Sequence, residues 1–405
     1  MNPVLRILLL LPFAPRLDAA HGGGRVLAQF LSELVNRHKV AVLYLRSPGE
    51  PIIDTYFRDR CALVEEVIRE TNGKSFLSRS LHGARLLSAL TRPRPMWVTD
   101  WANESFLIRA RSITREFQPD IVQAEFHVMG QYLTALDGCD APRVIVEHEP
   151  GARAAAYLRN IHPKVNAIFD RWDKRAWKRY EADLFRQVSA IVTFTEADRR
   201  AIRQISGQTP VFVIPPGIEI PDRPLDPLGQ EPPSLLFIGN FIHPPNAEAA
   251  LRLTRDIFPP IHRRIPEVKL FIVGDQPPPE VRQQAGENVV VTGRVPDVTP
   301  YLDRATLFVA PLRSGGGIRI KILEALAAGK AIVATPLAIE GLSLSDGREV
   351  AIAYQDDDFI AQVLDLIVHR AKRIDMARKA RAWACDHASW ERSIRSYEAL
   401  YASLR

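Results

Sequence analysis

The stretch 314–342 constrains this 405-residue chain most, because three glycines stand directly before a helical pattern. Apolar residues recur at helical spacing over 318–326, and Gly329 ends the run. A glycine-rich entry to a helix exposes backbone N–H groups at the positive end of the helix dipole. The stretch therefore predicts a cradle for a phosphate group, although a plain flexible turn is the alternative.

The surroundings of the glycines favour the cradle. Short apolar runs at 307–310 and 331–334 predict buried strands on either side, and a loop from a strand into a helix is where open α/β sheets bind ligands. We expect backbone groups of Gly316, Gly317 and Ile318 to line the cradle. Arg319 and Lys321 would supply cations to a diphosphate, and Glu324 would accept hydrogen bonds from a ribose; a surface position is the alternative for each of the three.

Composition bounds the class of protein. A hydrophobic content of 46% and a charged content of 25% are ordinary for a soluble globular chain. The three cysteines, Cys61, Cys139 and Cys385, show neither metal spacing nor a disulfide framework, which favours a reducing, cytoplasmic compartment. No run of 18 apolar residues predicts a membrane span, and the apolar start at 4–12 is interpreted as a buried strand rather than a signal peptide.

Positive charge is concentrated in the first half. Residues 1–215 hold 30 Lys and Arg against 23 Asp and Glu, whereas residues 216–405 hold 23 against 24. A basic surface suits an anionic membrane or an acidic substrate. No nucleic-acid-binding signature accompanies the charge, so nucleic acid is not expected as a partner. The basic aromatic segment 171–180, and also 92–97, could lie on an anionic bilayer; an ordinary helix packed on its own domain is the alternative.

Strands and helices alternate along the chain, which predicts parallel sheets. Residues 57–118 are expected to be mostly helical, 19–24 to be a loop before a helix at 25–36, and 164–188 to be a long basic helix. Proline-rich segments at 215–217 and 221–233 mark a linker. The expected strands are 7–11, 39–45, 119–124, 143–147, 189–194 and 211–214, then 235–239, 268–273, 288–291, 307–310 and 331–334.

Two Rossmann-like halves with a phosphate cradle in the second resemble the GT-B glycosyltransferases, and more narrowly the retaining enzymes of family 4. The strongest part is 293–342, supported by 21–24, 119–122, 195–196, 213–218, 272–275 and 389–391. The resemblance implies an α/β fold of two Rossmann-like domains facing a central cleft. It also implies an acceptor domain over 1–215, a nucleotide-sugar donor domain over 216–380, and a C-terminal helix over 381–405 that packs back on the first domain.

Two departures from the family pattern concern the donor. Family members often carry two glutamates eight residues apart, and here Glu324 is the second while Gly316 stands at the first position, which commonly contacts the donor sugar. After the first strand of the donor domain the family often has an arginine and a lysine, whereas this chain has 240–246, ending in Asn246. The cationic role is expected to have moved to Arg319 and Lys321.

The resemblance assigns further residues. Gly23 and Gly24 would approach the donor phosphate, unless they form only a tight turn, and Gly293, Arg294 and Val295 would meet the nucleobase. His148 follows a strand and would lie beside the transferred sugar, although a lone histidine is as often structural. Its neighbours Glu147 and Glu149 should point away from it, because successive side chains on an extended chain alternate.

The sequence thus predicts a hexosyltransferase-like enzyme that is retaining and metal-independent, with His148, Arg319 and Lys321 in the reaction. Its partners would be a nucleotide-sugar and a glycan or lipid-linked acceptor in polysaccharide or glycoconjugate synthesis, at the cytoplasmic face of a membrane. The acidic run 356–358 is interpreted as a helix start, not a metal site. Two alternatives stay open, namely an epimerase or hydrolase on the same fold and a non-catalytic nucleotide-sugar-binding component.

Overall fold

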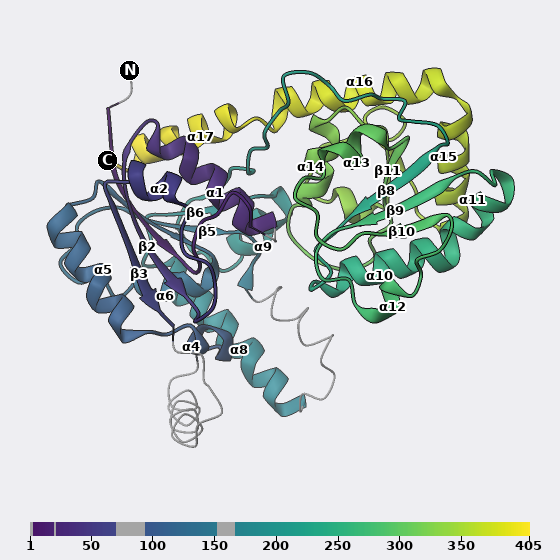
Figure 1. The fold of residues 1–405 in the computed structure, drawn as a ribbon. Helices are drawn as coiled ribbons and strands as arrows, with labels where there is room; N and C mark the ends of the chain where they lie inside the picture. The colour runs from purple at the N-terminus through teal and green to yellow at the C-terminus, as the bar shows by residue number, and fades with distance from the viewer. Residues whose placement is uncertain (1–2, 20–21, 70–93, 152–166) are drawn as a thin grey trace. The chain divides into compact units, whose positions relative to one another are not determined.

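The computed structural model describes residues 3–19, 22–69, 94–151 and 167–405, with side chains from residue 171 in the last range. They form two compact units, each built on one parallel sheet (Figure 1). Unit 1 holds the chain up to Ala19, Gly23–Pro216 and Ser393–Arg405, and unit 2 holds Gly22 and Gly217–Arg392. The C-terminal segment thus joins the unit that the N-terminal segment begins.

The seven-stranded sheet of unit 1 has the order β3-β2-β1-β4-β5-β6-β7. Its central strands are almost continuous apolar runs, as expected for parallel strands with both faces covered. The order reverses between β1 and β4, and at such a point the loops from the carboxyl ends diverge and leave a crevice. The strands are β1 (Arg6–Leu11), β2 (Lys39–Arg46), β3 (Leu63–Ile68), β4 (Ile121–Glu125), β5 (Arg143–Glu147), β6 (Ala190–Thr193) and β7 (Val211–Val213).

Helices of unit 1 begin where the sequence offers caps. Asn103 accepts from the N–H of Phe106 at the start of α5, and Thr195 accepts from the N–H of Asp198 at the start of α9. The helices are α1 (Gly22–Val35), α2 (Thr55–Arg60), α4 (Met96–Asp100), α5 (Glu104–Phe117), η1 (His127–Met129), α6 (Gly130–Leu133), α8 (Ala167–Phe185), α9 (Glu196–Arg203) and α17 (Trp390–Leu404), the last lying in unit 1 from Ser393 onward.

The six-stranded sheet of unit 2 has the order β10-β9-β8-β11-β12-β13 and reverses between β8 and β11. Its strands are β8 (Ser234–Ile238), β9 (Lys269–Val273), β10 (Val289–Val291), β11 (Leu307–Ala310), β12 (Ile332–Ala334) and β13 (Ala351–Ile352). Its helices are α10 (Pro244–Arg252), η2 (Leu253–Ile257), α11 (Phe258–Arg264), α12 (Pro279–Arg282), α13 (Thr299–Arg304), α14 (Ile320–Ala327), η3 (Pro336–Ile339), α15 (Asp356–Val368) and α16 (Arg370–His387).

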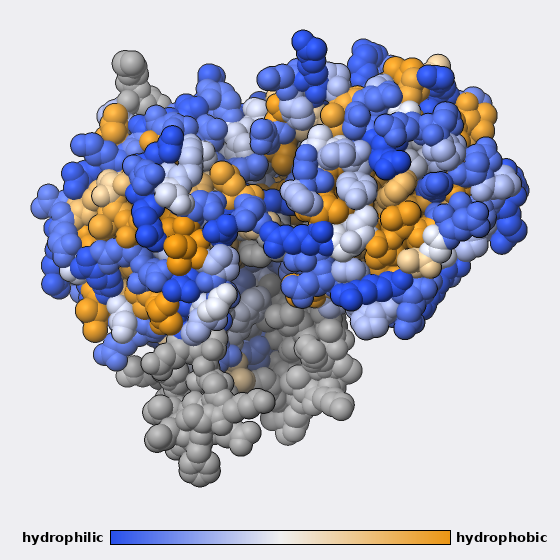
Figure 2. Space-filling model, in the orientation of Figure 1, coloured by the Kyte–Doolittle hydropathy of each residue, from blue (hydrophilic) through white to orange (hydrophobic). Residues whose placement is uncertain are grey.

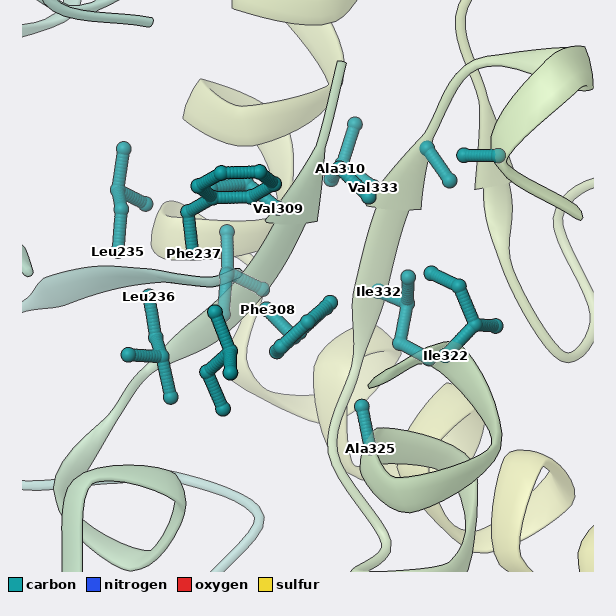
Figure 3. Close-up of a cluster of buried hydrophobic side chains, with 14 of the residues drawn as sticks. Leu235, Leu236, Phe237, Phe308, Val309, Ala310, Ile322, Ala325, Ile332 and Val333 are labelled. Atoms are coloured by element: carbon teal, nitrogen blue, oxygen red, sulfur yellow. The ribbon is translucent and has the colours of Figure 1, made fainter. Parts of the chain in front are cut away.

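The core of unit 2 holds α14 in place. Ile322 and Ala325 are fully buried in the same cluster as Phe308 of β11 and Ile332 of β12 (Figure 3). Burying such side chains stabilises the unit by about 1.5–3 kcal/mol each for the larger ones. Because α14 follows the glycine loop directly, this packing fixes where the loop ends.

Three predicted boundaries were wrong. Residues 63–68 form the edge strand β3 within a stretch that was expected to be helical. The strand was missed because Glu65 and Glu66 interrupt its apolar pattern, and charged residues of this kind are common on edge strands. Gly22–Gly24 begin α1 rather than preceding it. The helix α14 begins at Ile320, after its N-cap residue Arg319, and not at 318 as the apolar spacing over 318–326 indicated. The remainder of the predicted 57–118 helical region, over 70–93, lies outside the described residues.

The visible face of the molecule is mainly hydrophilic, with apolar residues in small groups (Figure 2). None of the helices in the described ranges is both long and apolar enough to span a bilayer. The proline-rich segment 221–233 contains neither helix nor strand, and it is tied to unit 2 by the N–H of Leu225 on the carbonyl of Ala328.

Candidate functional site

The glycine loop lies between β11 and α14, at the point where the sheet of unit 2 reverses its strand order. Gly315 and Gly317 have φ values of 104° and 70°, which residues with a side chain rarely adopt. The Arg319 guanidinium is buried and donates to the carbonyls of Gly315 at 2.9 Å and Gly316 at 2.6 Å, and also to that of Gly317. One side chain therefore holds all three carbonyls of the loop.

The N–H groups of the loop are in the opposite situation. Those of Gly315, Gly316 and Gly317 donate to no group in the part of the chain that the structure describes. Since the carbonyls are bound to Arg319, these donors are the polar groups that the loop has left to offer an anion. The structure thus gives Arg319 a contact that the sequence did not predict; its expected contact with a diphosphate remains a prediction.

Lys321 supplies the cation at this point. Its Nζ donates to Oδ1 of Asn246 at 2.6 Å and lies 4.5 Å from the centre of the Phe237 ring. Asn246 in turn donates to the carbonyl of Asn240 at 2.7 Å, so the loop after β8 and the start of α14 are connected. Burial, and secondly the charge of Lys321, lower the pKa of His243 in that loop. The predicted residues Lys321 and Asn246 therefore lie together.

Other predicted donor residues lie along the same sheet or on α14. Glu324 is half-buried on α14, one turn beyond Lys321. Gly293 follows β10, and its carbonyl accepts from the N–H of Gly274 at 3.1 Å. Arg294 is exposed, Val295 packs against the core, and Ile318 does the same beside the glycine loop. The ligand assigned to each of these residues stays a prediction.

The ends of β8 and β9 approach each other closely. A Cβ added to Gly274 would lie 1.8 Å from the carbonyl oxygen of Gly239, and Gly274 has a φ of 145°. Gly239 also donates to the carbonyl of Val273 at 2.9 Å. The ends of β8 and β9 therefore admit no side chain at Gly274.

In unit 1, His148 follows β5 and bonds to a carboxylate. Its Nε2 lies 2.7 Å from Oε2 of Glu125, which ends β4 and is 2% exposed. The ring is stacked on Phe126, with centroids 3.7 Å apart, and meets the edge of Phe194 at 4.7 Å. The ring of Phe13, which follows β1, has its centroid 5.4 Å from that of Phe126. Aromatic rings that follow three other strands thus form a row with His148.

The backbone of Phe126, whose ring stacks on His148, is strained. Its φ of 68° is uncommon for a residue with a side chain and costs about 1–3 kcal/mol. Such strain persists only where the surroundings enforce it, and it is often found at functional sites. Gly23 and Gly24 lie in the first turn of α1, so they do not form the tight turn considered as an alternative.

Glu147 points away from His148, which confirms the alternation expected for the strand. It is fully buried, neither of its oxygens accepts a hydrogen bond among the described residues, and Oε2 lies 3.8 Å from Nδ1 of His127. Burial, and then the charges of Glu181 and Asp198, raise its pKa well above the ordinary value. Burial also lowers the pKa of His127 to about 4. Burial therefore disfavours the charged form of both side chains.

Two further predictions concern charged segments. Asp356–Asp358 begin α15, as expected, and Asp356 pairs with Arg252 and Arg313. No cluster of three His, Cys, Asp or Glu with metal-binding geometry occurs among the described residues. On α8 the exposed cations are Arg171, Lys174, Arg175, Lys178 and Arg179, while Trp177 is buried. Residues 92–93 of the second basic segment lie outside the described ranges.

Glu125 and Gln123 were not predicted as site residues from the sequence. The sequence did contain a signal for them. Gln123 and Glu125 alternate along β4, and β4 is the neighbour of β5, the strand that precedes His148. Neighbouring parallel strands bring their carboxyl ends together, so a glutamate at the end of one strand lies within reach of a histidine after the next.

Comparisons with known proteins cover both units. The sequence profile of "Glycosyltransferase Family 4" matches residues 20–220, and that of "Glycosyl transferases group 1" matches residues 232–369. The phosphatidyl-myo-inositol mannosyltransferase of Mycolicibacterium smegmatis is 32% identical over 153 residues. That match spans 36% of this chain and 39% of the mannosyltransferase, so about two fifths of the relative is covered.

Two solved structures share the fold over nearly the whole chain. Sucrose-phosphate synthase from Thermosynechococcus elongatus aligns with a TM-score of 0.73 and 13% identity, covering 98% of this chain and 99% of that one. Anabaena HepE in complex with UDP and glucose aligns with a TM-score of 0.67 and 15% identity, covering 98% and 100%. At these identities the likeness concerns the fold, and it confirms the predicted pair of Rossmann-like domains.

Proposed function

Because this chain belongs to the family 4 glycosyltransferases, which have the GT-B fold, we propose that it moves a sugar from a nucleotide-sugar to a hydroxyl of a glycan or of a lipid-linked acceptor. The observation that carries the proposal is the glycine loop of unit 2. Its N–H groups have no partner among the described residues, and Lys321 lies at the same reversal of strand order. This is the arrangement that a diphosphate requires.

The proposed chemistry follows from where negative charge develops. When the bond between the sugar and the nucleoside diphosphate breaks, the leaving phosphate gains charge, and preorganised donors stabilise it. Lys321 and the N–H groups of Gly315–Gly317 would do so here, with Arg319 holding the loop in shape. Glu324 would accept hydrogen bonds from the ribose. We propose that no metal is required.

Retention of configuration is part of the same proposal and derives from the family resemblance. In such a reaction the departing phosphate helps to deprotonate the acceptor, and the new bond forms on the face that the leaving group vacates. His148 is the residue of unit 1 that we assign to the transferred sugar. Its ring is held by Glu125, Phe126 and Phe194, so its orientation is fixed before any substrate binds.

A thermal-shift panel of UDP, GDP, ADP, CDP and dTDP tests the donor site. A nucleotide at ~100 times its dissociation constant should add about 2.7 kcal/mol to the free energy of unfolding. We expect one base to stabilise the wild-type protein and the Glu280→Ala control, whose glutamate is exposed on α12, but to stabilise Glu324→Ala much less. The absence of a shift with every nucleotide would overturn the proposal.

One observation favours a second function. Gly316 replaces the glutamate that commonly contacts the donor sugar in the family, so the protein could bind a nucleotide-sugar without transferring it. Turnover separates the two functions. Release of the nucleoside diphosphate from a sugar-nucleotide, dependent on an added acceptor, would establish transfer, whereas tight binding without release would establish the binding role.

The basic face of α8 supports the proposed contact with an anionic membrane at its cytoplasmic side. Each exposed Lys or Arg near such a surface contributes about 1 kcal/mol of attraction. Reversing Arg175 and Lys178 to glutamate should therefore abolish co-sedimentation with vesicles rich in phosphatidylglycerol. The matched control reverses Arg263 and Arg264, which are exposed on α11. Equal binding of both variants would exclude α8 as the contact.

A further inference from the structure

A chain of three hydrogen bonds connects His148 to the C-terminal helix within unit 1. Tyr401 donates from its hydroxyl to Oε1 of Gln123 at 2.6 Å, and Nε2 of Gln123 donates to Oε1 of Glu125 at 2.6 Å. Nε2 of His148 lies 2.7 Å from Oε2 of the same carboxylate. Gln123 and Tyr401 are fully buried and Glu125 is 2% exposed, so water does not compete for the two bonds of Gln123; the bond to His148 is partly buried.

The direction of each bond follows from the donor inventory. The Tyr401 hydroxyl meets the amide oxygen of Gln123, so the amide nitrogen faces Glu125 and donates. An ionised carboxylate only accepts, and Glu125 has one oxygen toward Gln123 and the other toward the imidazole. Nε2 of His148 must then carry the proton of the pair. In the neutral imidazole this leaves Nδ1 as a hydrogen-bond acceptor.

The other ring nitrogen of His148 is Nδ1, and its contacts within the described ranges decide whether it can take a ligand. No described residue forms a hydrogen bond with Nδ1 of His148, and the ring cannot turn freely between Phe126 and Phe194. The strained backbone of Phe126 is what brings its ring parallel to the imidazole, at an interplanar angle of 13°. Nδ1 is therefore the atom of His148 that remains for a ligand.

We propose that Glu125 is a positioning residue that fixes His148 as the Nε2–H tautomer, so that Nδ1 accepts a hydrogen bond from a substrate hydroxyl. The identity of that substrate rests on the proposed function. The assignment of the tautomer does not, because it follows from the hydrogen bonds of Glu125 alone. Only a carboxylate satisfies both donors that converge at this position. A glutamine at 125 offers one oxygen and one NH₂ group, so either the Gln123 bond or the imidazole bond must be remade. The imidazole can adapt by moving its proton to Nδ1.

The test measures the tautomer in the free, full-length protein with ¹⁵N-labelled histidine at a pH where the imidazole is neutral. Protonated and unprotonated ring nitrogens have distinct shifts. Among the ten histidines, the signal of His148 is the one that disappears in His148→Gln. We expect the Nε2–H form in the wild-type protein and a shift toward the Nδ1–H form in Glu125→Gln. The control is Glu66→Gln, which removes a carboxylate that accepts from Tyr44 and Arg46 elsewhere in unit 1.

A wild-type spectrum with His148 as the Nδ1–H tautomer would overturn the proposal, as would an unchanged tautomer in Glu125→Gln. Should Glu125→Gln fail to fold, the wild-type spectrum alone decides. Once an acceptor is known, Glu125→Gln should lower turnover about 10²-fold, the scale of a misplaced catalytic group, without changing the dissociation constant of the nucleotide. Because the spectra need no substrate, failure of the tautomer assignment is distinct from failure of the proposed transferase activity.

Discussion

Nζ of Lys321, at the start of α14, donates to Oδ1 of Asn246 on α10 across 2.6 Å. The two residues are 75 positions apart, and their contact closes the reversal point of the sheet in unit 2. The lysine is not a solvated side chain that would reach a ligand only when one arrives. It is held next to the glycine loop, with its ammonium group over the Phe237 ring. A preorganised cation loses less entropy when it binds a phosphate.

Lys321→Met should weaken nucleoside diphosphate binding by about 10- to 100-fold. The substitution retains an unbranched side chain beside Phe237 but removes the charge, and a hydrogen bond to a charged group contributes about 1.5–3 kcal/mol. Isothermal titration with the nucleotide identified in the thermal-shift panel measures the change. Lys372→Met, which removes a surface lysine paired with Asp365, should bind like the wild-type protein. Equal affinities in the two variants would remove Lys321 from the donor site.

Arg319→Lys separates two roles for the arginine. If the guanidinium serves mainly to hold the carbonyls of the glycine loop, a lysine cannot reach all three, and nucleotide affinity should fall nearly as far as in Arg319→Ala. If the charge itself contacts the diphosphate, the lysine variant should retain most of the affinity. We expect the first result, together with a lower melting temperature in both variants, measured by calorimetry and titration.

Much of the fold was predictable because parallel strands are short, continuous apolar runs. Runs such as 143–147 and 307–310 coincide with β5 and β11 to the residue. The strand β3 was not predictable in the same way, since two glutamates occupy its middle and its single neighbour is β2. A charged edge strand has no apolar period that distinguishes it from a helix.

The candidate site divides along similar lines. The glycine loop and Lys321 were visible because their spacing to a helix start is local. The role of Arg319 depends on where its side chain turns, and the link between Gln123 and Tyr401 joins residues 278 positions apart. No local pattern specifies such a contact, which arises only when the C-terminal helix packs on unit 1.

Glu147→Gln should stabilise the protein increasingly as pH rises. The pKa of Glu147 is raised in the folded state, so its stabilising contribution is complete below its ordinary value of 4.5 and is lost as pH rises through the folded-state pKa. The glutamine side chain does not titrate, so Glu147→Gln loses no stability from this group as pH rises. Between the two pKa values the difference in unfolding free energy should grow by about 1.4 kcal/mol per pH unit in favour of the variant.

Urea unfolding of both proteins between pH 5 and pH 8 measures this difference. The control is Glu116→Gln, because the pKa of the exposed Glu116 is lowered by its hydrogen bond from Ser112, and its removal should give no gain that increases with pH. Parallel stability profiles for the wild type and Glu147→Gln would show that the buried carboxyl is not protonated in the folded state.

Tyr401→Phe should reduce turnover and leave nucleotide affinity unchanged. The loss of one neutral hydrogen bond should cost about 1 kcal/mol of unfolding free energy, and Gln123, without its donor, can rotate its amide and release Glu125. Tyr132→Phe removes a buried hydroxyl that donates to the Trp101 carbonyl and accepts from the N–H of Asn103, so it should cost at least as much stability but retain turnover. A similar loss of turnover in both variants would mean that general softening of unit 1, rather than the path from Tyr401 to His148, lowers the activity.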